Sequence, residues 1–127
     1  MINDKWVNMR ENILKAKTFS FSIRIVNCYK FLIHEKKEFV LSKQLLRSGT
    51  SVGAMVREAE HSESKSDCIH KMAIAQKEIN ESIYWLELLN ATEYLSLDLF
   101  NSLNNDAVEI IKLITVSIKT AKSSINH

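Results

Sequence analysis

The sequence predicts an all-α protein with the architecture of an antiparallel up-down-up-down four-helix bundle. Its 127 residues include no proline and only two glycines, whereas a β-rich domain of this length needs many more turn residues. Apolar residues recur at helical spacing along four segments joined by short turns, and short turns place consecutive helices antiparallel. The chain is long enough to bury one core, so residues 1–127 are expected to form a single domain.

The first helix is expected over residues 14–36, after a short polar lead-in over residues 1–12. Two apolar stripes run side by side along this helix, and together they are wider than one core face requires. We therefore expect the helix to be buried on two sides. One stripe comprises Phe19, Ile23, Val26, Tyr29 and Ile33, and the other comprises Phe21, Ile25, Cys28 and Leu32.

The remaining helices are expected over residues 39–62, over residues 65–95 and from residue 96 onward. Ser64, followed by Asp67 three residues later, resembles an N-terminal cap of the third helix. Either Ser96 or Asp98 can cap the fourth helix.

Both glycines lie in the middle of the second helix. The segment Gly49-Thr50-Ser51-Val52-Gly53 matches the G-x-S-x-G pattern of serine hydrolases, but that pattern requires a buried strand before the serine. Here the surrounding apolar residues have helical spacing, and the preceding residues are good helix formers. Each glycine costs about 0.5–1 kcal/mol inside a helix, so a close approach by another backbone is the simplest reason for its presence.

Gly49, Ser51 and Gly53 are therefore candidates for close helix packing or for an oligomer contact. The sequence leaves open whether the neighbouring helix belongs to the same subunit. Trp85 joins this group, because the leucines around it favour a core or subunit contact over a platform for a nucleobase.

The residues that catalysis or metal binding would need are not found in a suitable pattern. A di-iron bundle needs two Glu-x-x-His motifs, and the chain has one, which ends at His61. Cys68 and His70, with His61, lack the spacing of a zinc site. No base partner for Ser51 can be identified. We therefore predict a protein that is not an enzyme, with no catalytic residues, no metal and no cofactor.

The positive charge is concentrated near the N-terminus. Residues 1–38 carry 8 Lys and Arg against 4 Asp and Glu, whereas the whole chain has a net charge of +2. This excess fits either a solvated helix face or a surface that binds a polyanion. The candidate nucleic-acid-binding residues are Lys36, Lys37, Lys43, Arg47 and Arg57. The alternative for Arg47 is an ion pair with a carboxylate of a neighbouring helix or subunit.

The sequence gives no sign of a membrane or secretory location. No stretch approaches the roughly 18 apolar residues of a membrane span, and the N-terminus lacks the layout of a signal peptide. Cys28 and Cys68 are expected to be reduced thiols. A cytoplasmic protein is therefore predicted.

Several motifs carry a family resemblance. They are the segments 37–54, 58–59, 64–67, 71–75, 77–78 and 84–86. In these motifs the chain resembles, from about Phe19 to Lys122, the four-helix-bundle proteins encoded in intervening sequences of bacterial 23S rRNA genes. It departs from them at Met55, where many members have Asn, and at Cys68, near which they have an aromatic residue.

The resemblance implies a small cytoplasmic bundle that assembles with itself into a ring-shaped homopentamer. The family is similar to the accessory proteins of diversity-generating retroelements, basic pentameric barrels that work with a reverse transcriptase and its RNA. By this analogy we expect a non-enzymatic accessory or chaperone-like protein that binds RNA or DNA, with a reverse transcriptase or another protein as a further partner. The alternative is a ring-shaped protein-interaction scaffold without a nucleic-acid role.

Overall fold

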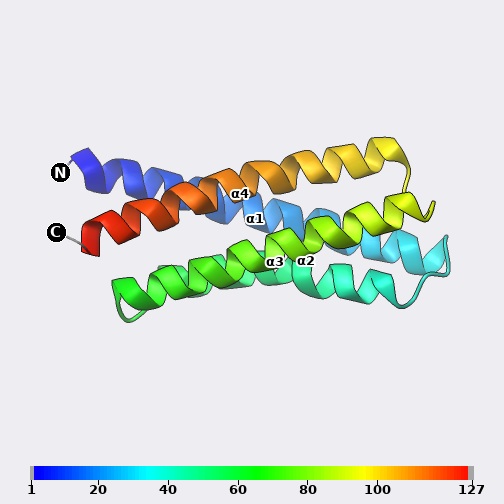
Figure 1. Ribbon diagram of the computed structural model, residues 1–127, viewed down its shortest axis with the longest axis horizontal. Helices are drawn as coiled ribbons and strands as arrows, with labels where there is room; N and C mark the ends of the chain where they lie inside the picture. The colour runs from blue at the N-terminus through cyan, green and yellow to red at the C-terminus, as the bar shows by residue number, and fades with distance from the viewer. Residues whose placement is uncertain (1, 126–127) are drawn as a thin grey trace.

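The computed structural model describes the backbone of residues 2–125 and the side chains of residues 9–124. Its elements are α1 (Ile2–His34), α2 (Leu41–Glu60), α3 (Lys65–Ala91) and α4 (Leu97–Ile125). The helices run alternately up and down, and α1 and α4 have their free ends at the same end of the bundle (Figure 1). Each helix contacts two others, in the order α1, α2, α3, α4 and back to α1. The predicted all-α antiparallel bundle is confirmed.

The expected lead-in over residues 1–12 is wrong for the residues that the structure describes. α1 already begins at Ile2, and Met1 lies outside the described part. Residues 2–12 contain neither proline nor glycine, so nothing in this segment interrupts a helix despite its polar composition. The N-terminal half of α1 also has a packing partner, because Arg10 donates a hydrogen bond of 3.1 Å from Nη1 to Oγ1 of Thr120 on α4.

Local hydrogen bonds set the other helix limits. Ser64 accepts from the backbone N–H of Asp67 at 3.0 Å, which confirms the cap of α3. α3 ends at Ala91, earlier than expected, because the N–H groups of Tyr94 and Leu95 both turn back to the carbonyl of Leu89. Ser96 caps α4 by accepting from the N–H of Leu99 at 3.2 Å.

The buried face of α1 corresponds to the second of the two predicted stripes. Phe21, Ile25, Cys28 and Leu32 are all buried, and Leu14 extends this face toward the N-terminus. In the other stripe Phe19 is 51% exposed and Ile23 is 49% exposed. Within one chain, α1 is therefore not buried on two sides.

The two glycines allow α1 and α2 to cross closely within the chain. A Cβ atom added at Gly49 would lie 2.8 Å from both Cγ1 and Cγ2 of Ile25. A Cβ atom at Gly53 would lie 3.3 Å from Oγ of Ser22 and 3.4 Å from the carbonyl oxygen of Thr18. Of the two possibilities that the sequence left open, the structure shows close packing inside one subunit.

A buried carboxylate caps the N-terminus of α2. Glu38 is only 7% exposed, and its carboxylate accepts N–H bonds from Val40, Leu41 and Ser42 at 3.0, 2.8 and 2.6 Å. Burial alone would raise the pKa of Glu38, but these donors outweigh it and hold the pKa below its usual value. The carboxylate thus satisfies N–H groups that the first turn of a helix leaves without partners.

We expect Gly49→Leu to destabilise the protein by several kcal/mol, because the Ile25 atoms that it meets are next to the backbone and cannot move aside. Gly53→Ala should be close to neutral, because its contacts are looser and alanine favours the helix by about 0.5–1 kcal/mol. Ala54→Leu, at an exposed position of the same helix, is the control. Urea unfolding followed by circular dichroism measures all three, and a Gly49→Leu protein as stable as its parent would contradict the close crossing.

Glu38→Gln should lower the free energy of unfolding at neutral pH by about 1–2 kcal/mol through loss of the charged cap. Because the pKa of Glu38 is lowered in the folded state, its stabilisation is complete above the unfolded-state pKa and is lost as the pH falls through the folded-state value. The difference between variant and parent should therefore shrink in acid. Glu35→Gln, at an exposed position of the same turn, removes one carboxylate that caps no helix and is the control at neutral pH.

Candidate nucleic-acid interface

Several cations of α1 are already paired with acids of neighbouring helices. The three ion pairs are Lys15 with Glu60 at 3.1 Å, Lys17 with Glu109 at 2.5 Å, and Arg24 with Asp106 at 2.6 Å. Arg24 also donates to Oγ of Ser102 at 2.8 Å. These side chains are partly exposed, so each pair adds little stability, typically about 0–1 kcal/mol. Much of the positive excess of residues 1–38 thus faces α2 and α4.

All five candidate residues, by contrast, are exposed: Lys36, Lys37, Lys43, Arg47 and Arg57. Lys36 and Lys37 lie in the α1–α2 turn, and the other three lie on α2. Among the side chains that the structure describes, only Arg47 of these five has an ion-pair partner, with Nη2 3.9 Å from Oε1 of Glu81 on α3. The Arg47 side chain is still 68% exposed, so the expected pair with a neighbouring helix forms only loosely.

The three basic residues of α2 share one face of the helix. Lys43, Arg47, Thr50, Ala54 and Arg57 are spaced alternately four and three residues apart, which places them along one stripe. From Lys43 to Arg57 this stripe is about 21 Å long, at about 1.5 Å per residue. The turn lysines continue it at the N-terminal end of α2, and we call the five candidate cations together the basic band.

Two of these cations lie over exposed aromatic rings of α1. The guanidinium carbon of Arg57 is 5.0 Å from the ring centroid of Phe19, and Nζ of Lys36 is 5.8 Å from that of Phe31. Sequence reasoning missed both pairs. It placed Phe19 in an apolar stripe and assigned no role to Phe31, because a contact between two helices depends on their relative rotation.

The predicted packing residues lie within the bundle. Ser51 donates from Oγ to the carbonyl of Arg47 at 2.6 Å inside α2, so the G-x-S-x-G segment is not a nucleophile elbow. Trp85 is half-buried and packs against the core, and its Nε1 donates to Glu81 at 3.3 Å. The exposed Tyr84 ring meets that of Trp85 edge to face at 5.1 Å.

Within the part of the chain that the structure describes, the cysteines and histidines form no site. Burial raises the pKa of the Cys28 thiol to about 11, and burial likewise raises that of Cys68. Both cysteines are free. Over the described residues, no group of His, Cys, Asp and Glu is placed to hold a metal ion.

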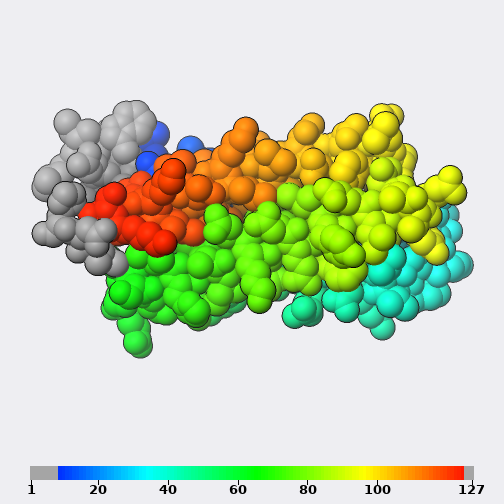
Figure 2. All heavy atoms as spheres, in the orientation of Figure 1, coloured from blue at the N-terminus to red at the C-terminus, as the bar shows by residue number. Residues whose placement is uncertain are grey.

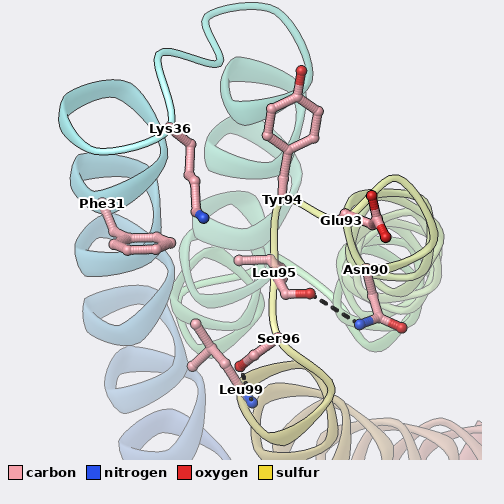
Figure 3. A pocket seen from close by; sticks show the side chains of 8 residues that line it. All are labelled: Phe31, Lys36, Asn90, Glu93, Tyr94, Leu95, Ser96 and Leu99. Atoms are coloured by element: carbon pink, nitrogen blue, oxygen red, sulfur yellow. Dashed lines mark hydrogen bonds between the residues drawn. The ribbon is translucent and has the colours of Figure 1, made fainter.

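A hollow of about 420 Å³ opens where the α1–α2 turn meets the α3–α4 loop. Figure 2 shows these two segments, in cyan and yellow, beside each other at one end of the molecule. The hollow is lined by Phe31, Lys36, Asn90, Glu93, Tyr94, Leu95, Ser96 and Leu99 (Figure 3). Lys36 is thus both a member of the basic band and part of the hollow. No other sequence-predicted site residue lines it.

The fold and the basic band together define a small helical bundle with a basic surface. Comparison with known proteins identifies its family. Residues 10–116 match the family of the 23S rRNA-intervening sequence protein, and the chain belongs to this family. It is similar to a protein of unknown function from the S23 ribosomal protein family of Bacteroides thetaiotaomicron, whose crystal structure was solved at 1.70 Å. The two chains are 55% identical, the match covers 87% of this chain and 98% of the other, and the TM-score is 0.86. No curated protein matches.

Within the described residues, no helix has the length and apolar character to cross a membrane.

Proposed function

We propose that this protein is a non-enzymatic, oligomeric four-helix-bundle protein that binds RNA as an accessory or chaperone-like subunit. The observation that carries the proposal is the contrast between the two sets of cations. Lys15, Lys17 and Arg24 of α1 are paired with acids of α2 and α4. Four members of the basic band have no ion-pair partner among the described side chains, namely Lys36, Lys37, Lys43 and Arg57. Unpaired, exposed cations along one surface are suited to phosphate groups.

The division of charge along the chain supports the same proposal. Residues 1–60 carry 11 Lys and Arg against 6 Asp and Glu, and residues 61–127 carry 6 against 9. A polyanion is therefore attracted to the α1–α2 side and repelled from the α3–α4 side. The description of the family, which names a 23S rRNA intervening sequence, is compatible with an RNA ligand.

Self-association forms the second part of the proposal. Four large apolar residues on the outward half of α1 are about half exposed: Met9 at 46%, Ile13 at 45%, Phe19 at 51% and Ile23 at 49%. A monomer gains nothing from such a stripe, whereas a second copy of the chain would cover it. The proposed assembly is a ring-shaped homopentamer, as the family resemblance implies, and the ring would repeat the basic band around its axis. The same stripe is also what the alternative, a protein-interaction scaffold, would use.

Replacing Lys36, Lys37 and Lys43 together by Glu should lower the affinity for single-stranded RNA at low salt by more than tenfold. It should also flatten the logarithmic salt dependence by about 2, because each lost phosphate contact contributes about 0.7. The matched control changes Lys112, Lys119 and Lys122 of α4 to Glu. It changes the net charge of the protein by the same amount, but on a helix that, over the part of the chain that the structure describes, does not contact α2. Fluorescence anisotropy measures both triple variants. If both triple variants lose the same RNA affinity, the effect comes from net charge and not from the basic band. If the parent protein binds no RNA, the protein-interaction scaffold is the remaining function.

Ile23→Glu should dissociate the assembly, because it places a charge in the apolar stripe that a second copy covers. Val116→Glu, at a position of α4 that is 45% exposed, should leave the assembly intact. Multi-angle light scattering should show the parent and the α4 variant at the same multiple of 14.6 kDa, and Ile23→Glu near 14.6 kDa itself. A parent protein of 14.6 kDa at micromolar concentration would contradict self-association.

A further inference from the structure

The hollow at the turn end of the bundle combines apolar walls with polar and charged groups. Its volume of about 420 Å³ lies within the range of about 300–1,000 Å³ that small-ligand sites occupy. Phe31, Leu95 and Leu99 give it apolar walls, and Lys36 supplies a cation. In Figure 3, Lys36 and Phe31 lie together on one side of the hollow, and Asn90 and Glu93 lie on the α3 side.

The backbone around the hollow is held in place by several hydrogen bonds. The N–H groups of Tyr94 and Leu95 donate to the carbonyl of Leu89 at 2.9 and 3.2 Å, and Asn90 donates from Nδ2 to the carbonyl of Leu95 at 3.0 Å. On the opposite side, the N–H of Glu38 donates to the carbonyl of Leu32 at 3.0 Å. A ligand therefore meets preformed walls, and little ordering is needed on binding.

We propose that this hollow binds one unpaired nucleotide of a single-stranded RNA, with its base against Phe31 and its phosphate on Lys36. This inference rests on the proposed RNA-binding function and names the part of the RNA that this end of the bundle recognises. Phe31 is 37% exposed, so part of its side chain is free to stack a base. Lys36 is an exposed, flexible side chain whose ammonium group can move from the ring to a phosphate.

The charges of the hollow fix the direction of the nucleotide. The Glu93 carboxylate repels a phosphate on the α3 side, so the phosphate lies on the side of Lys36. An apolar side chain of a protein partner fits less well, because it offers no partner to the Lys36 ammonium, whereas a phosphate does. A base in a duplex is stacked between its neighbours and cannot enter, so the hollow selects unpaired nucleotides.

The test uses a short fluorescein-labelled RNA of mixed pyrimidine sequence, either single-stranded or annealed to its complement. Phe31→Ser should lower the affinity of the full-length protein for the single strand at least about fivefold, through loss of one base–aromatic stack. Its affinity for the duplex should not change. Phe31→Tyr keeps a ring and should restore single-strand binding. Phe39→Ser is the matched control, since Phe39 is an aromatic residue of the adjoining α1–α2 turn, is 54% exposed and does not line the hollow.

In this test, circular dichroism serves to check that each variant is folded. If Phe31→Ser binds the single strand as tightly as its parent does, the hollow is not the nucleotide site, although the basic band still binds RNA. An equal loss for single strand and duplex also overturns the proposal, because a stacking site would discriminate between them. A parent that binds neither RNA overturns the proposed function itself, and a protein partner would then be the occupant to seek.

Discussion

The close crossing of α1 and α2 at the two glycines is the constraint on which the rest of the structure depends. A Cβ atom on residue 49 would lie only 2.8 Å from Cγ1 and Cγ2 of Ile25, so a side chain there would push the two helices apart. The crossing fixes the rotation of α1, and the rotation decides which of its two apolar stripes enters the core. It also brings Phe19 beneath Arg57 and places Lys15 beside Glu60. The helix-propensity cost of about 0.5–1 kcal/mol per glycine is small against the packing that the contact allows.

The same rotation explains why charge and apolar surface are distributed unevenly. The buried face of α1, which extends from Leu14 to Leu32, points into the core. One flank of the helix therefore faces α4, where Lys17 pairs with Glu109 and Arg24 pairs with Asp106. The apolar residues that the core cannot take are left on the outward half. Lys36 and Lys37 in the α1–α2 turn, and Lys43 and Arg57 along α2, have no such carboxylate partner among the described side chains. They lie in the turn and on the helix that adjoin α1, which carries the half-exposed apolar stripe. A basic surface next to an apolar one suits a subunit that associates with its own copies and attracts a polyanion.

The architecture could be predicted from the sequence because apolar periodicity and the scarcity of glycine and proline both report local backbone structure. The helix limits were less predictable. The polar residues 2–12 resemble a lead-in, but they contain no proline or glycine that would disfavour a helix, and α1 runs through them. The site was predictable only as a set of exposed cations. Which of them are free depends on ion pairs such as Lys17 with Glu109, more than ninety residues apart in the chain, and their spacing does not encode this pairing.

The α1–α2 turn combines a strained backbone with an unusually complete cap, and the two features belong together. Lys37 has φ of 54°, a conformation that costs a residue with a side chain about 1–2 kcal/mol. The next residue, Glu38, accepts three backbone N–H bonds in return, and Oγ of Ser42 donates to its carbonyl at 2.8 Å. These bonds stabilise the turn against the strain, so Lys36 and Lys37 project from a fixed backbone rather than from a fluctuating loop. Because less entropy is lost when the backbone that carries a charged group is already fixed, this turn is better suited to phosphate contacts than Lys15, Lys17 and Arg24 of α1, which already have carboxylate partners.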